Sequence, residues 1–283
     1  MNVGQALRAA SARLQHIDET GALDASRLLE HLTGRDRAGL LLAADVPLDA
    51  ATSAELEALV ARRERGEPVA YLVGNAGFYG RTFLVDERVL VPRPESEHIV
   101  EAVVDDLRAR RKTSGIVVDV GTGSGALGIT LACELTDLAV YATDISPAAL
   151  SVARRNAALN GVFQRCTFLL GDLLEPLARF GERVDAVVAN LPYIPAGDVP
   201  VAPNPASFEP RVALDGGPDG LDVYRRLLAQ LETVAAEDAV VFLEAAPGTI
   251  EPLSDLVEAM FPAAFIEIGE DYAGLERFLA FVR

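Results

Sequence analysis

The stretch that decides the fold is residues 116–125, which read IVVDVGTGSG. Its first half, Ile116–Val120, is a β-branched apolar run, and such runs predict a buried strand. Its second half is a glycine-rich turn, in which the chain can reverse tightly and approach a ligand closely. A helix is expected next, over residues 126–135. The G-x-G-x-G spacing differs from the G-x-G-x-x-G of dinucleotide sites, so the turn alone does not identify a ligand.

Strands and helices alternate through the rest of the C-terminal part. Ser146-Pro147 predicts a helix start, with Ser as N-cap and Pro at the first helical position, and Asn160-Gly161 predicts its end. Further strands are expected at 140–143, 168–170, 184–189 and 239–243, followed by a terminal hairpin from 265–268 and 278–282. This order predicts an α/β fold, with a mostly parallel sheet and helices on both faces.

The first 70 residues are helical in pattern and contain no cluster of catalytic side chains. Asp24 is expected to cap a helix that ends near Gly34, and Ser53 is expected to precede another. A β-hairpin is expected after them, with its turn near Asp86-Glu87. We therefore expect a helical domain at 1–72, a hairpin linker at 73–92 and an α/β domain at 93–283.

The bulk composition excludes several classes of protein. The 283 residues carry a net charge of −17, whereas a nucleic-acid-binding protein needs a basic surface, so direct nucleic-acid binding is not expected. Two widely separated cysteines, Cys133 and Cys166, argue against a disulfide framework or a zinc site. Residues 1–12 match neither a signal peptide nor a membrane span. We expect a monomeric cytoplasmic protein that contacts no membrane and uses no metal.

The polar candidates for a site all lie where predicted parallel strands end, which is where such sheets bind ligands. Asp144 ends the second strand, where its carboxylate can accept hydrogen bonds from two ribose hydroxyls. Asp172 ends the third strand, where it can accept from an adenine amino group. With the turn and the end of the fourth strand, the candidates are Gly121, Thr122, Gly123, Ser124, Gly125, Asp144, Asp172 and Asn190.

Asn190-Leu191-Pro192-Tyr193 follows the fourth strand and favours methyl transfer over hydride transfer. An amide or aromatic amine nitrogen has a delocalised lone pair and is a poor nucleophile. The Asn190 side-chain carbonyl and the Leu191 main-chain carbonyl can accept its two N–H bonds, which favours a tetrahedral, reactive nitrogen. Tyr193 can stack on the planar group, and Pro192 stiffens the loop. S-adenosylmethionine is the expected cofactor, because its sulfonium supplies an activated methyl group.

With these residues in view, the sequence resembles the release factor glutamine methyltransferases over nearly its whole length. The shared features include the helical N-terminal part, residues 121–125 and the Asn190 tetrapeptide. Two segments are specific to that family: residues 85–97, which contain Arg93-Pro94-Glu95, and residues 208–221, which begin with Phe208-Glu209-Pro210.

The resemblance implies a class I S-adenosylmethionine-dependent methyltransferase, with a Rossmann-like sheet of seven mostly parallel strands. It implies N5-methylation of a glutamine in the Gly-Gly-Gln loop of peptide chain release factors, which the helical domain would help to dock. By the same analogy Leu173 and Asn190 join the residues that bind the cofactor. Residues 190–193 would hold the glutamine amide, with Asn190, Pro192 and Tyr193 as the catalytic candidates.

Departures from the family pattern leave the acceptor open. Leu191 stands where the family usually has Pro, and Asn-Leu-Pro-Tyr also occurs in ribosomal RNA adenine dimethylases. Ser96 replaces a usual Thr, and Glu244-Ala245-Ala246 replaces Glu-Ile-Gly. The alternatives are methylation of another protein glutamine, a peptide or a small molecule, N6-methylation of adenine in RNA or DNA, and a non-catalytic binding module. The acidic composition disfavours a nucleic-acid acceptor.

Overall fold

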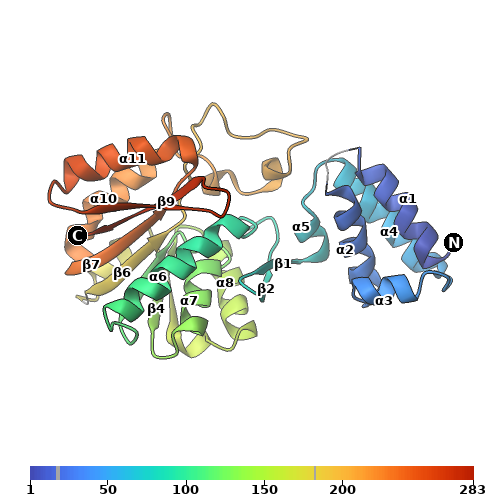
Figure 1. Ribbon diagram of the computed structural model, residues 1–283, viewed down its shortest axis with the longest axis horizontal. Coiled ribbons are helices and arrows are strands. Elements are labelled where there is room, and N and C mark those ends of the chain that lie inside the picture. Colours follow the sequence, from blue (N-terminus) through green and yellow to red (C-terminus); the bar gives the residue numbers. More distant parts are fainter. Residues whose placement is uncertain (17–19, 182) are drawn as a thin grey trace. The chain divides into compact units, whose positions relative to one another are not determined.

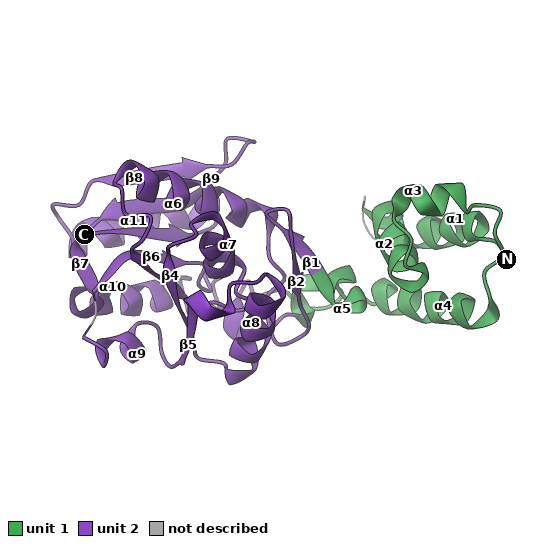
Figure 2. Cartoon of the chain, turned by 90° about the horizontal axis from the view of Figure 1, so that it is seen from below, with its two compact units in different colours: residues 1–75, 200–208 green, residues 76–199, 209–283 purple. Residues whose placement is uncertain are grey.

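The computed structural model describes residues 1–16, 20–181 and 183–283. It divides the chain into two compact units, coloured green and purple in Figure 2. The first unit comprises Met1–Asn75 with Pro200–Phe208, and the second comprises Ala76–Val199 with Glu209–Arg283. None of the helices within the described ranges combines the length and the apolar composition that a membrane span requires.

The first unit is a small helical bundle. Its helices are α1 (Val3–Leu14), α2 (Gly21–Thr33), α3 (Arg37–Leu42), α4 (Ala50–Glu64) and α5 (Val69–Val73). Apolar side chains from all five helices share one buried core. Side chains of Asn2, Asp36 and Asp49 accept main-chain N–H groups at the starts of α1, α3 and α4. Gly34 ends α2 in the left-handed conformation, as expected.

Two helix starts differ from the expectation. Helix α2 begins at Gly21, so Asp24 lies inside its first turn and pairs with Arg63 of α4 at 2.7 Å. Both side chains are buried, and a buried guanidinium needs an acidic partner more than the helix needs a cap. Helix α4 begins at Ala50 behind Asp49, before Ser53, and the short helix α3 was not expected.

The segment 200–208 packs on the helical bundle at Gly66. This glycine has a φ of +97°, and a Cβ at its position would lie 2.0 Å from the main-chain oxygen of Pro203. Only glycine allows both the left-handed backbone and this close approach. The segment thus completes the first unit although residues 76–199 separate it from the helices.

The second unit is built on a seven-stranded sheet with the strand order β5-β4-β3-β6-β7-β9-β8. The parallel strands are β3 (Ile116–Val120), β4 (Ala139–Asp144), β5 (Cys166–Leu170), β6 (Val184–Ala189) and β7 (Ala235–Glu244). Strand β9 (Glu276–Val282) runs antiparallel to both of its neighbours, β7 and β8 (Ile266–Glu270). The mostly parallel sheet and its terminal hairpin are therefore confirmed.

Helices cover both faces of this sheet (Figure 1). On one face α6 (Glu97–Ala109), α7 (Ala126–Glu134) and α8 (Pro147–Leu159) enclose one hydrophobic core. On the other face α9 (Glu175–Ala178), α10 (Asp222–Val234) and α11 (Pro247–Met260) enclose a second core. Because both faces are covered, the central strands are apolar on both sides, as their sequences indicate.

The predicted hairpin is present, but its turn lies elsewhere. Strands β1 (Asn75–Phe78) and β2 (Arg81–Leu84) are joined by Tyr79 and Gly80, with φ values of 50° and 69°. Two left-handed residues form the tight turn that suits a twisted hairpin. The apolar residues Val85 and Val89, which suggested a second strand with a turn near Asp86-Glu87, are buried in the loop that follows.

Candidate active site

The strand order reverses at β3, which has β4 on one side and β6 on the other. Such a reversal leaves a crevice at the carboxyl ends of the strands, and a cavity of the second unit lies there. Within the described residues, every predicted site residue lines this cavity except Gly125 and Tyr193. One cavity therefore collects the glycine turn, the two strand-end aspartates and most of the Asn190 tetrapeptide.

The glycine turn adopts a backbone that side chains disfavour. Gly121, Gly123 and Gly125 all have positive φ values, of 69°, 55° and 85°. A Cβ on Gly121 would lie 2.8 Å from Cδ2 of Leu191, so the turn packs directly against the Asn190 tetrapeptide. Gly125 is not among the residues that line the cavity and is the N-cap of α7. The positive φ values and the close approach at Gly121 explain why this part of the cavity wall is built from glycine.

Asp119 holds the turn from below and was missed by the sequence reasoning. Its buried carboxylate accepts hydrogen bonds from the Thr122 hydroxyl at 2.6 Å and from the Gly128 amide at 3.0 Å. Burial raises the pKa of Asp119 to about 6, and these two hydrogen bonds oppose the shift. A single carboxylate within the apolar run Ile116–Val120 was the available signal, because unpaired acids are rarely buried.

Asp144 has the geometry expected of a ribose-binding carboxylate. One oxygen accepts from the Gly123 amide at 2.9 Å and the other from the Ser146 amide at 2.8 Å. Each carboxylate oxygen has a further lone pair, so two hydroxyl groups can still be accepted. Burial raises the pKa of Asp144, while the backbone hydrogen bonds oppose that shift. The residues at this place fit a nucleoside of S-adenosylmethionine.

Asp172 and Leu173 line the same cavity from the end of β5. Asp172 forms an ion pair with Arg226 of α10, a partner that the sequence reasoning did not include. Leu173 is buried and has a φ of 52°, which is unusual for a residue with a side chain. The ion pair joins two residues that both line the cavity, and the second oxygen of the Asp172 carboxylate can still accept a hydrogen bond.

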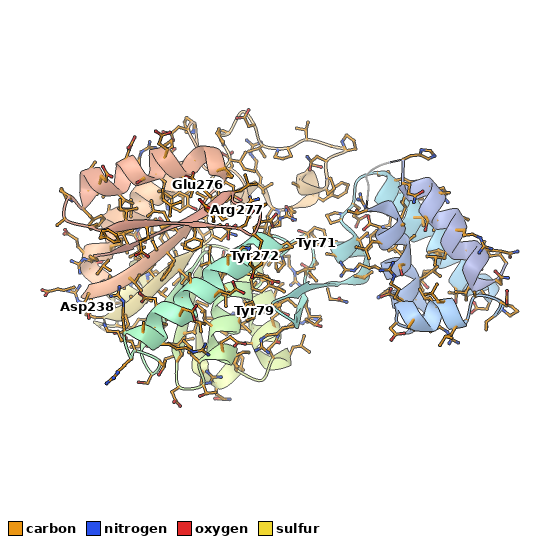
Figure 3. The ribbon with its side chains drawn as sticks, viewed as in Figure 1. Tyr71, Tyr79, Asp238, Tyr272, Glu276 and Arg277 are labelled. Carbon is orange, nitrogen blue, oxygen red and sulfur yellow. The ribbon has the colours of Figure 1, made fainter. Side chains whose placement is uncertain are left out.

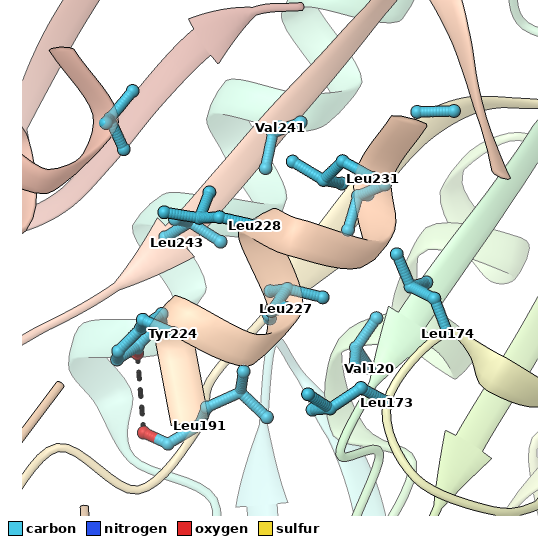
Figure 4. Close-up of a cluster of buried hydrophobic side chains, with 14 of the residues drawn as sticks. Val120, Leu173, Leu174, Leu191, Tyr224, Leu227, Leu228, Leu231, Val241 and Leu243 are labelled. Carbon is cyan, nitrogen blue, oxygen red and sulfur yellow. Dashed lines mark hydrogen bonds between the residues drawn. The ribbon is translucent and has the colours of Figure 1, made fainter. Parts of the chain in front are cut away.

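Asn190 and Leu191, which carry the two acceptor oxygens proposed from the sequence, both line the cavity. The Asn190 Nδ2 donates to the Ser96 hydroxyl at 3.2 Å, which turns the side-chain oxygen away from Ser96. The Leu191 main-chain oxygen lies 3.3 Å from the Tyr224 hydroxyl, the contact drawn in Figure 4. The same hydroxyl makes a shorter contact with the Glu244 main-chain oxygen. Tyr224 has one proton to donate, so the Leu191 oxygen keeps acceptor capacity.

Pro192 and Tyr193 complete the tetrapeptide in different ways. Pro192 lines the cavity, whereas Tyr193 packs against the hydrophobic core that contains Leu191 and Tyr224. Burial raises the pKa of the Tyr193 phenol to about 12, helped by the negative charge of Glu244. The phenol is therefore protonated near neutral pH and does not act as a base there.

The two family-specific segments meet at the edge of the cavity. The buried Glu209 carboxylate pairs with Arg93 at 2.5 Å and accepts from the Val91 amide at 3.1 Å. Arg93 and Pro210 both line the cavity. One ion pair thus joins two segments that lie more than a hundred positions apart. In the sequence, only the resemblance to the family singled out these two segments.

The sheet order, the glycine turn and the strand-end aspartates define a class I S-adenosylmethionine-dependent methyltransferase. Solved structures agree on the fold: a 16S rRNA N2 G1207 methyltransferase of T. Thermophilus has a TM-score of 0.52 at 20% identity, covering 74% of this chain and 49% of that chain. A methyltransferase of Pyrococcus furiosus has a TM-score of 0.50 at 16% identity, covering 72% and 89%.

Sequence comparisons identify the family. Residues 5–74 match the PrmC N-terminal domain, and residues 101–193 match the ribosomal protein L11 methyltransferase family. The release factor glutamine methyltransferase of Bacillus anthracis is 37% identical over 281 residues, 98% of each chain. That of Moorella thermoacetica is 40% identical over 285 residues, covering 100% of this chain and 99% of its own. The chain belongs to the release factor glutamine methyltransferase family.

Proposed function

We propose that the protein transfers a methyl group from S-adenosylmethionine to the side-chain amide nitrogen of a glutamine, in the Gly-Gly-Gln loop of peptide chain release factors. The observation that carries this proposal is the pair of acceptors, the Asn190 side chain and the Leu191 main-chain oxygen, at the edge of the cavity. The full-length relationship to release factor glutamine methyltransferases supports the choice of a glutamine.

The chemistry follows from these two acceptors. A primary amide has two N–H bonds, and the two oxygens accept one each. This arrangement draws the nitrogen toward a tetrahedral geometry and stabilises the positive charge that develops as it is methylated. When bound, S-adenosylmethionine supplies an activated methyl group, so positioning is the main requirement. The proton is shed easily after transfer, and a strong base is unnecessary.

Leu191 keeps this chemistry although the family usually has Pro at its position. The acceptor is a main-chain oxygen, which any residue provides. The Leu191 side chain is 3% exposed and belongs to the core below the sheet end, close to Gly121. Packing of the side chain in that core replaces the stiffness that a proline ring would give.

The cofactor would be held by residues 121–124, Asp144, Asp172, Leu173 and Asn190. Asp144 would accept the ribose hydroxyls, and Asp172 an adenine N–H. We further propose that the helical residues 1–72 help to dock the release factor, and that the protein acts in the cytoplasm, where release factors work on the ribosome.

A three-way labelling experiment tests the proposal. The protein is incubated with methyl-labelled S-adenosylmethionine and, separately, with release factor, ribosomal protein and ribosomal RNA. We expect label in the release factor, and mass spectrometry should locate it on the glutamine of the Gly-Gly-Gln peptide. Label in RNA alone would show that Asn190-Leu191-Pro192-Tyr193 serves an adenine, and label in another protein would identify a different glutamine.

A further inference from the structure

Glu244 lies beside Asn190 at the end of the neighbouring strand. The register of β6 and β7 pairs Ala189 with Leu243, so the residues that follow, Asn190 and Glu244, are adjacent. Ser96 approaches both from the short helix formed by Pro94–Ser96. Ser96 and Glu244 are each 4% exposed, so solvent does not compete for their hydrogen bonds.

These three side chains lie next to one another at the ends of β6 and β7. The Asn190 Nδ2 donates to the Ser96 hydroxyl at 3.2 Å. The Ser96 hydroxyl in turn lies near enough to the Glu244 carboxylate to lower the pKa of Glu244 as a hydrogen-bond donor, and we take the three as one hydrogen-bond chain. Among the described residues no group donates to the second oxygen, Oε2, of Glu244, although that oxygen is buried. A buried carboxylate that leaves an oxygen unsatisfied costs stability, and such a cost points to a functional reason for keeping it.

The charge on Glu244 decides which group donates and which accepts in each of these hydrogen bonds. A carboxylate can only accept, so the Ser96 proton points to Glu244, and the Ser96 oxygen can only accept from Asn190. The Asn190 NH2 group is then bound to Ser96, and its oxygen faces the opposite way. A protonated Glu244 can instead donate to Ser96, whose own proton can then bond to the Asn190 oxygen and turn the amide over.

We propose that Glu244 and Ser96 are positioning residues that hold the Asn190 oxygen toward the nitrogen to be methylated. The identity of that nitrogen rests on the proposed function. The hydrogen bonds among Asn190, Ser96 and Glu244 are argued independently of it. The charged and titratable groups that face Glu244 are Glu95 and Arg93 beside Ser96, Arg277 on β9 (Figure 3), Tyr193 and Tyr224.

Burial and Glu95 together raise the pKa of Glu244 to about 7, against the opposing effects of the Ser96 hydrogen bond, Arg277 and Arg93. Methyl transfer should therefore be fast above this pKa, where Glu244 is ionised, and should fall as the pH drops through about 7. The loss should appear in kcat, because the Asn190 oxygen acts on the reacting nitrogen.

The kinetic test uses Ser96→Ala, Glu244→Gln and Ser96→Thr in the full chain, with release factor as substrate. We expect Ser96→Ala and Glu244→Gln to lower kcat about tenfold or more, and Ser96→Thr to restore it, since threonine keeps the hydroxyl. Glu244→Gln should also lose the fall in kcat as the pH drops through about 7.

Calorimetry should give an unchanged Kd for S-adenosylmethionine in all three variants. Thr130→Val, at a buried hydroxyl in α7, and Glu258→Gln, at an exposed acid in α11, are the matched controls.

An infrared titration tests the chain of hydrogen bonds without turnover. A carboxyl band that titrates near pH 7 should be absent in Glu244→Gln, and Ser96→Ala should raise its pKa because a stabilising donor is lost. A folded Glu244→Gln variant with the full rate and an unchanged pH profile would overturn the positioning role. An unmoved pKa in Ser96→Ala would overturn it even if the release factor proved not to be the substrate. If the pKa of Glu244 rises in Ser96→Ala but no release factor is methylated, the hydrogen-bond chain stands and only the proposed substrate is rejected.

Discussion

Asn190 is the residue on which the proposed chemistry depends, and its two polar groups have different partners. Its NH2 group donates one hydrogen bond to Ser96, and in the proposed arrangement its oxygen accepts from the nitrogen to be methylated. Removing the Asn190 side chain should therefore affect the reaction most, because the cofactor would keep its contacts with the glycine turn, Asp144, Asp172 and Leu173.

We therefore expect Asn190→Ala to lower kcat by about 100-fold or more, because one preorganised acceptor is removed from the reacting nitrogen. The Kd for S-adenosylmethionine should change by less than about threefold. Single-turnover kinetics and calorimetry measure the two quantities. Asn160→Ala, at the end of α8, is the matched control and should retain its rate. Undiminished methylation by Asn190→Ala would show that another group holds the nitrogen.

A second prediction at this scale concerns stability. The folded-state pKa of Glu244 is raised from 4.5 to about 7, so the folded protein binds a proton more tightly than the unfolded chain. This contribution to stability is fully present at low pH and is lost as the pH rises through about 7. Glu244→Gln should match the parent near pH 4, below the unfolded pKa, and exceed its unfolding free energy at pH 8 by roughly 1–3 kcal/mol. Denaturant titrations at the two pH values check this, and a constant difference would contradict it.

At the scale of elements, the turn between β3 and α7 combines structure and ligand binding. Gly125 has a φ of 85°, and a Cβ there would lie 2.4 Å from Cδ1 of Ile129. Gly125→Ala should cost roughly 1–3 kcal/mol and weaken cofactor binding, because the turn must shift. Gly248→Ala, in the first turn of α11 with open space around it, should instead stabilise by up to about 1 kcal/mol. Thermal unfolding of both variants measures the contrast; equal losses would mean that the turn is not under strain.

The elements also show what could be predicted from sequence. Strands β3 and β6 were predicted to the residue, because continuous apolar runs between glycines and polar residues mark buried parallel strands. The hairpin turn was misplaced, because Val85 and Val89 are buried without being in a strand. Asp24 was wrongly predicted to cap α2. Its carboxylate instead forms an ion pair with Arg63, a residue far away in the sequence, and the helix begins at Gly21.

The same limit applies to the site. The turn, Asp144 and the Asn190 tetrapeptide each follow a strand and could be placed by that rule. The contacts of Ser96, Tyr224, Arg226 and Glu244 could not, since they depend on strand register and on which helix covers which face. Local pattern thus predicted residues that line the cavity, and only the packed structure gave the residues that contact them.

At the scale of the whole molecule, the net charge of −17 opposes nucleic-acid binding. We expect an excess of ribosomal RNA at physiological salt to leave the rate of release factor methylation unchanged within about twofold, because phosphates are repelled. Initial rates with and without RNA give the answer, with an RNA-binding methyltransferase as positive control. Strong inhibition by RNA would reveal a local basic surface that overrides the overall charge.

The placement of residues 200–208 in the first unit has a consequence for biosynthesis. The ribosome makes the helices of residues 1–75 first and the segment that packs on Gly66 only after residues 76–199. The N-terminal bundle therefore emerges from the ribosome without residues 200–208, and it stays incomplete until residues 76–199 of the second unit have been translated. Translation speed through residues 76–199 thus sets how long that bundle remains incomplete.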